Sequence, residues 1–104
     1  MRKLVRNNIV NLVSEEAGKK VEPHEAGLRK MTGWEYNYAL QLKMHEEWRE
    51  AWEDPCPEEF ADCLEVLQAA AAYHGVDWND VLEARAKKFA EKGSFDHRWE
   101  MTIK

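Results

Sequence analysis

The sequence predicts an all-α protein, a short bundle of about four helices with a central acidic helical hairpin and a short C-terminal strand. Apolar residues recur at helical spacing in several segments, and glycines and prolines separate those segments. The 104 residues are the length of one compact domain, so we expect a single domain over 1–104. A chain of this size buries only about 60–68% of its unfolded surface. We therefore expect a homodimer or homotetramer.

The first helix is expected over 3–17. Apolar residues at positions 5, 9, 12 and 13 give it one apolar face, and Gly18 ends it. The connection over 18–32 contains Pro23 and has no helical period. It is expected to be irregular, with room for a short extended piece at 20–25.

Two further helices are expected to form a hairpin. Thr32 and Glu35 match a capping box, which predicts the start of the longer helix. Two prolines end that helix near Glu53, because proline lacks the helical N–H donor and restricts the residue before it. Pro57 suits the first position of the next helix. The sequence therefore predicts a tight turn at 54–56.

The C-terminal third is expected to hold one more helix. The preceding helix stops at Gly75, and Asp77 caps a helix over 78–91. After Gly93 the pattern changes to alternation of apolar and polar residues, which predicts a short strand. The alternating apolar residues are Trp99, Met101 and Ile103.

Composition excludes several classes of function. The net charge of −5 argues against nucleic-acid binding, which needs clustered Lys and Arg. The longest apolar stretch, 64–72, is too short for a membrane span, and the charged N-terminus lacks a following apolar segment. We therefore expect a cytoplasmic protein with no membrane partner. Cys56 and Cys63 lie about 10 Å apart if both are helical, so they are expected to be reduced thiols.

Four carboxylates are expected to meet at the hairpin. Glu47 and Glu50 share one helix face, as do Glu59 and Asp62. Glu47 with Asp62 and Glu50 with Glu59 have the same index sum, so the two pairs face each other across the turn. Their mutual repulsion calls for a counter-cation, and an all-oxygen set favours Mg²⁺, Mn²⁺ or Ca²⁺ over zinc.

The acidic pairs have two other interpretations. An isolated Glu-x-x-Glu pair usually lies on a solvated helix face, and Glu53 and Glu58 show that this region is acidic in any case. A di-iron bundle would need Glu-x-x-His motifs on its helices, which this chain lacks. The symmetric placement of two pairs about one turn favours a metal site.

The chain resembles the MazG-like all-α nucleoside triphosphate pyrophosphohydrolases, whose signature is Glu-x-x-Glu on one helix and Glu-x-x-Asp on the next. The segment 3–9, Lys-Leu-Val-Arg-Asn-Asn-Ile, resembles the Lys-Leu-Val-Arg-Asp-Lys-Ile opening of a small branch related to phosphoribosyl-ATP pyrophosphohydrolase. Segment 59–66 resembles its Glu-Leu-Ala-Asp-Val-Leu-Glu-Val helix. Lys92-Gly-Ser-Phe95, followed by Arg98, resembles its Arg-Gly-Gly-Phe tail.

The resemblance implies hydrolysis between the α and β phosphates of a nucleoside or deoxynucleoside triphosphate, with Mg²⁺ as cofactor and Mn²⁺ as a substitute. It implies metal ligation by the four carboxylates and a general base at Glu46 or Glu47. Basic side chains should bind the phosphates. The candidates are Lys43, Arg85, Lys88, Lys92, Arg98 and Arg6.

Two other functions stay open. One is phosphoribosyl-ATP hydrolysis, and the other is a non-catalytic helical dimer that binds a nucleotide or a protein. The nucleotide base needs a stacking surface and an amide. The candidates are Trp34, Tyr38, Trp48, Trp52, Asn7 and Asn11, although an aromatic stripe at helical spacing is more often core or a dimer contact.

Overall fold

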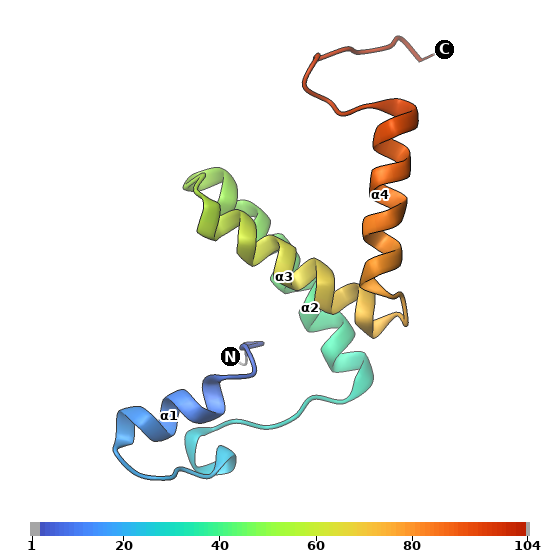
Figure 1. Ribbon diagram of the computed structural model, residues 1–104. Coiled ribbons are helices and arrows are strands. Elements are labelled where there is room, and N and C mark those ends of the chain that lie inside the picture. The colour runs from blue at the N-terminus through green and yellow to red at the C-terminus, as the bar shows by residue number, and fades with distance from the viewer. Residues whose placement is uncertain (1–2, 104) are drawn as a thin grey trace. The chain divides into compact units, whose positions relative to one another are not determined.

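Every regular secondary-structure element of the described residues is a helix. The computed structural model describes residues 3–103 (Figure 1). Within that range the elements are α1 (Ile9–Ala17), a 3-10 helix η1 (Pro23–Ala26), α2 (Gly33–Glu53), α3 (Pro57–Tyr73) and α4 (Trp78–Lys92). The all-α prediction is therefore confirmed.

The chain divides into two compact units. The first ends at Ala70, and the second begins at Ala71. The first holds α1, η1, α2 and most of α3, and the second holds the end of α3, α4 and the C-terminal segment. A single domain over 1–104 stays a prediction. None of the helices described combines the length and the apolar character that a membrane crossing requires.

Helix α1 is shorter than predicted, because it begins at Ile9 rather than at position 3. The backbone at 3–6 has no regular structure. In this segment Lys3 and Arg6 form ion pairs with carboxylates of α2 and α3, so these residues contact the hairpin instead of continuing α1. At its other end α1 stops at Gly18, which adopts the predicted left-handed conformation with φ 68°.

The connection between α1 and α2 differs from the sequence prediction. Its centre is the 3-10 helix η1 rather than an extended piece at 20–25. Pro23 occupies the first helical position, where its fixed φ is favourable. The connection is tied to α1 through Ser14, whose hydroxyl oxygen accepts a hydrogen bond from the Val21 N–H at 2.9 Å.

Helix α2 begins at the predicted capping box. One carboxylate oxygen of Glu35 accepts hydrogen bonds from the Thr32 N–H and from the Thr32 hydroxyl, each at 3.0 Å. Arg29 donates to both Glu35 oxygens, at 3.1 and 2.6 Å. The hydrogen bond from Arg29, followed by those from Thr32, lowers the pKa of Glu35 to about 2.

Helices α2 and α3 form an antiparallel hairpin and lie side by side (Figure 1). Helix α2 ends at Glu53 and α3 starts at Pro57, so the turn occupies 54–56 as predicted. The buried apolar side chains of the described residues are few. They are Leu40 and Ala51 on α2 and Val66 on α3.

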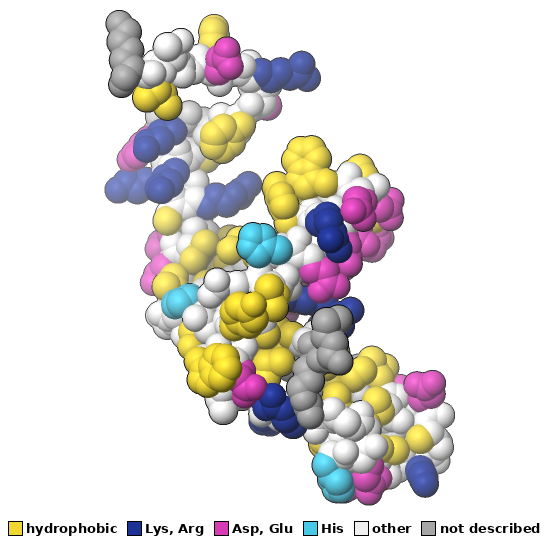
Figure 2. All heavy atoms as spheres, turned by 180° about the vertical axis from the view of Figure 1, so that it is seen from behind, with side chains coloured by type: hydrophobic (Ala, Val, Ile, Leu, Met, Phe, Trp, Pro, Cys, Tyr) yellow, Lys and Arg dark blue, Asp and Glu magenta, His cyan; other side chains and the backbone are white. Residues whose placement is uncertain are grey.

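Many large apolar side chains stay exposed, and Figure 2 shows hydrophobic side chains at the surface of the face that it draws. On α2 the exposed fractions run from 52% to 74%. The residues concerned are Trp34, Tyr38, Leu42, Trp48 and Trp52.

The second unit contains α4, capped as predicted. The Asp77 carboxylate accepts a hydrogen bond from the Asn79 N–H at 2.8 Å. The predicted C-terminal strand is wrong, because no strand occurs among residues 3–103. Alternation indicates a strand only if another extended segment pairs with it and one face is covered. Here Trp99 and Ile103 are 90% and 87% exposed.

The capping box generates the first prediction. Because the pKa of Glu35 is depressed, its stabilising contribution is fully present above the ordinary value of 4.5 and is lost as the pH falls toward about 2. Replacing Glu35 with Gln should lower the melting temperature at pH 7 by a few degrees. The same substitution should flatten the acid limb of a plot of melting temperature against pH. Glu16→Gln, at an exposed position of α1, should leave both measurements unchanged.

Candidate functional site

The central feature of the hairpin is a carboxylate cluster formed by Glu47, Glu50 and Glu59. Each side chain places one carboxylate oxygen within 4.8 Å of the others. Glu47 and Glu50 are three residues apart on one face of α2, and Glu59 follows the short turn on α3. The turn at 54–56 thus sets the register that brings the three side chains together.

Burial makes this cluster chemically unusual. Glu47 is only 6% exposed, and its Oε1 accepts a contact from the Lys43 ammonium at 3.0 Å. Its other oxygen, Oε2, is buried without a hydrogen-bond partner, as is Oε2 of Glu59. A buried carboxylate oxygen without a partner costs free energy. These two oxygens fit a bound hard divalent cation, because carboxylate oxygen is the donor that Mg²⁺ and Mn²⁺ prefer.

Two members of the cluster resist ionisation. Desolvation, together with the charges of Glu47, Glu46 and Glu59, raises the pKa of Glu50. Desolvation and the nearby charge of Asp62, followed by those of Glu47, Asp54 and Glu58, raise the pKa of Glu59. The neighbouring thiol of Cys63 has a raised pKa for the same two reasons, burial first and then the surrounding carboxylates. Burial and the neighbouring carboxylates therefore both disfavour full ionisation of the cluster.

Asp62, the fourth residue of the expected quartet, binds a cation of the protein instead. Its Oδ1 accepts a hydrogen bond from the Arg6 guanidinium at 2.6 Å. The group of mutually close carboxylate oxygens contains Glu47, Glu50 and Glu59 but not Asp62. Asp62 nevertheless borders the cluster, since its charge acts on the pKa of Glu59.

Glu46, a candidate general base, is flanked by two ammonium groups. Its oxygens lie 3.5 Å from the Lys43 Nζ and 3.6 Å from the Lys3 Nζ. The charge of Lys43 is the main cause of a lowered pKa at Glu46, so this carboxylate is ionised at neutral pH. Partial burial opposes ionisation of Lys43, but the hydrogen bond to Glu47 and the charges of Glu46 and Glu47 outweigh it and raise the pKa of Lys43.

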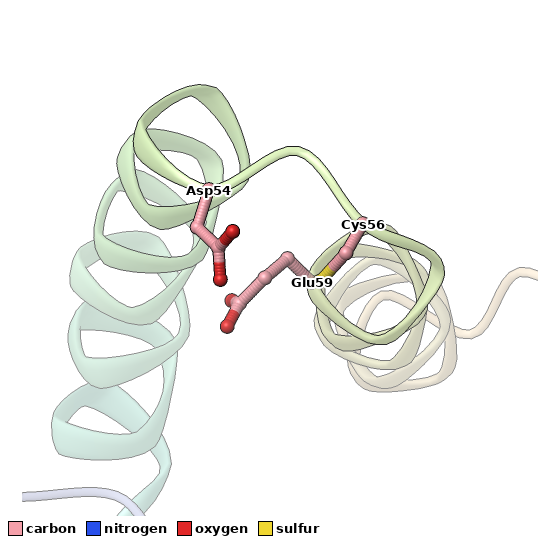
Figure 3. Close-up of side chains that lie close together, drawn as sticks. All are labelled: Asp54, Cys56 and Glu59. Atoms are coloured by element: carbon pink, nitrogen blue, oxygen red, sulfur yellow. The ribbon is translucent and has the colours of Figure 1, made fainter.

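A second group of possible ligands lies at the turn of the hairpin. Oxygens of Asp54 and Glu59 and the Cys56 sulfur lie within 4.8 Å of one another. The Asp54 and Glu59 carboxylates point toward each other across the turn (Figure 3). Sequence reasoning missed this group, because it treated 54–56 only as a connection. The thiol adds a softer donor than the three-carboxylate cluster offers.

Residues 3–9, which we call the N-terminal segment, form one wall of a groove of about 840 Å³ beside the hairpin. Lys3 and Arg6 line it together with Lys43, Glu47 and Asp62. Apolar side chains of the segment and of both helices complete the lining. They include Leu4, Ile9, Leu40 and Val66. Sequence reasoning overlooked Lys3, although it is the first residue of the motif that contains Arg6.

The remaining basic residues that the sequence singles out lie in the unit after Ala70. Helix α4 carries three of them at spacings that place them on one side of the helix, and one follows it. All four are exposed. They are Arg85, Lys88, Lys92 and Arg98.

Comparison of the chain with protein-family models, with curated proteins and with solved structures finds no match. Membership of the MazG-like family therefore stays a prediction that depends on the residues quoted above.

The raised pKa values give the second prediction. A carboxyl group whose folded pKa is raised destabilises the fold above that pKa, and the penalty disappears as the pH falls through the raised pKa toward 4.5. Glu50→Gln should therefore raise the melting temperature of chelator-treated protein at pH 7. The gain should shrink as the pH is lowered to about 4.5.

The matched control is Glu53→Gln, one turn along α2, where the side chain is 68% exposed and lies 3.8 Å from Arg49. Its melting temperature should equal that of the wild type or lie slightly below it. An equal gain in both variants would show that general acidity, and not the cluster, destabilises the hairpin.

Proposed function

We propose that the chain is a Mg²⁺-dependent nucleoside triphosphate pyrophosphohydrolase of the MazG-like type. The reaction adds water across the bond between the α and β phosphates and yields a nucleoside monophosphate and pyrophosphate. One observation carries this proposal. Glu47 is buried among two further carboxylates and keeps an oxygen without a hydrogen-bond partner at the seam of a helical hairpin.

The proposed metal ligands are Glu47, Glu50, Glu59 and Asp62. A bound divalent cation, Mg²⁺ or in its place Mn²⁺, would neutralise phosphate charge and lower the pKa of the attacking water. Glu46 or Glu47 would orient that water and accept its proton. Glu46 is ionised at neutral pH, and its lowered pKa makes it a weaker proton acceptor than an ordinary glutamate.

Lys43 and Arg6 are the proposed phosphate-binding residues of the first unit. Both line the groove beside the cluster, and each now binds one of the proposed metal ligands. The groove volume lies within the usual range for small-molecule sites. Four further cations stay proposed for phosphate binding on their charge and exposure. They are Arg85, Lys88, Lys92 and Arg98.

We also propose that the chain functions as a homodimer or homotetramer in which hairpins from different subunits form the helical bundle. The spacing of the exposed aromatic residues of α2 places them along one side of the helix, away from Leu40 and Glu47. Helix α3 likewise exposes Phe60, Leu64 and Leu67 along one side. Exposed apolar side chains that line one side of each of two helices are typical of a protein–protein interface. The aromatic stripe is therefore assigned to assembly and not to base stacking.

The third prediction concerns activity. Purified protein incubated with Mg²⁺ and each common NTP and dNTP should release monophosphate and pyrophosphate in equal amounts. Glu50→Gln should lower turnover by about 100-fold or more, because it removes a proposed metal ligand. Glu53→Gln should retain wild-type turnover.

Product analysis also separates the alternatives. Phosphoribosyl-ATP should be tested in the same panel. If it alone is hydrolysed, the substrate is phosphoribosyl-ATP and not a nucleoside triphosphate. Absence of turnover with every substrate, in protein that binds nucleotide, would indicate a non-catalytic binding module.

The fourth prediction concerns assembly. Light scattering after size-exclusion chromatography should give a mass at least twice the 12.2 kDa of one chain. Leu64→Glu, in the middle of the exposed face of α3, should shift the mass to that of one chain. Val10→Glu, at an exposed apolar position of α1, should not. A wild-type protein that is active as a monomer would contradict the proposal.

A further inference from the structure

Three cations of the protein are paired with carboxylates of the proposed site, of which two are proposed metal ligands and one, Glu46, is a candidate general base. Arg6 binds Asp62 at 2.6 Å, Lys43 binds Glu47 at 3.0 Å, and Lys3 lies 3.6 Å from Glu46. The ion pairs of Arg6 and Lys3 join residues far apart in the sequence, so they connect the N-terminal segment to the hairpin.

Two of the three ion pairs are solvent-exposed. The Arg6 and Asp62 side chains are 64% and 41% exposed, and those of Lys3 and Glu46 are 62% and 33% exposed. Ion pairs in such positions are weak, because water screens both charges. The Lys43–Glu47 pair is more buried, with side-chain exposures of 20% and 8%. A divalent cation carries twice the charge and binds carboxylate oxygen more closely than an ammonium or a guanidinium does, so it would compete with these side chains for the carboxylates.

The local charge leaves room for both kinds of cation. The cluster and its two neighbours, Glu46 and Asp62, provide five carboxylates, which face the three cations Lys3, Arg6 and Lys43. Asp54 and Glu58 add further negative charge beside Glu59, so the carboxylates near the cluster outnumber the three cations. A triphosphate that approaches this region brings several more negative charges, so it needs the three protein cations as well.

The same three cations line the groove beside the hairpin. They can turn from a carboxylate to a phosphate within that groove, because all three side chains are long and flexible. Arginine suits the new partner particularly well, since its guanidinium binds phosphate through two parallel hydrogen bonds.

Resting on the proposed function, we propose that Lys3, Arg6 and Lys43 are exchangeable counter-ions. In the metal-free protein they neutralise Glu46, Glu47 and Asp62. Binding of a divalent cation by Glu47, Glu50, Glu59 and Asp62 would release Lys43 and Arg6. Together with Lys3, which pairs with Glu46 beside the cluster, these side chains would then bind the phosphates of the nucleotide. Lys3 and Arg6 would therefore contact the substrate directly, and the N-terminal segment would couple metal binding to nucleotide binding.

The proposal makes opposite predictions for metal and for phosphate. In Arg6→Gln, calorimetric titration with Mn²⁺ alone should show affinity about two- to fivefold tighter than in the wild type, because a competitor is gone. With Mn²⁺ present, binding of inorganic triphosphate should weaken about tenfold or more. Arg6→Lys should restore both values toward the wild type. Arg49→Gln, which removes an exposed cation elsewhere on α2, should change neither.

Limited digestion with trypsin tests the movement directly. Cleavage after Arg6 should be slow in the metal-free protein, faster with Mn²⁺ alone, and slow again with Mn²⁺ and triphosphate. Cleavage after Lys20, whose ion pair with Glu22 is remote from the cluster, should be constant.

Different results would contradict the exchange of counter-ions and the enzyme assignment. Unchanged or weaker Mn²⁺ affinity in Arg6→Gln, in protein that still hydrolyses nucleotides, would overturn the exchange and leave the enzyme assignment standing. A wild-type protein that binds no Mn²⁺ would overturn both.

Discussion

Repulsion among carboxylates that a short proline turn forces together is the constraint on which the rest of this structure depends. The turn at 54–56 fixes how α3 pairs with α2, and that pairing places Glu59 beside Glu47 and Glu50. Apolar packing supplies little of the force that holds the hairpin, since few apolar side chains are buried. Desolvation and mutual repulsion raise the pKa values of Glu50 and Glu59. Because the core is so small, the fold tolerates this destabilisation most easily if a bound ligand offsets it.

The N-terminal segment lies beside the same carboxylates. Lys3 and Arg6 form ion pairs with the hairpin, and the backbone between them lies outside the helix that its apolar pattern favours. The groove beside the cluster is one result of this arrangement. The N-terminal residues supply one part of its lining, charged and apolar, and α2 and α3 supply the rest.

Local chemistry made most of the helices predictable from the sequence. The box of Thr32 and Glu35, the prolines of the turn and the cap at Asp77 act within a few residues, so the helix limits that they set agree with the structure. The start of α1 was not predictable in this way, because the residues before it contact α2 and α3, which lie far along the sequence. The index sums identified three carboxylates that do converge. They could not reveal that Arg6 competes for Asp62, since the pairing depends on where a distant segment lies.

The length of the turn between α2 and α3 has a consequence for how this chain tolerates change. Only three residues separate Glu53 from Pro57, so the end of α2 and the start of α3 are held close together and Glu59 lies beside Glu47 and Glu50. A longer loop would constrain the pairing of the two helices less, because additional loop residues give the chain more ways to connect them. The spacing between the two acidic motifs is thus as much a part of the site as the acidic residues.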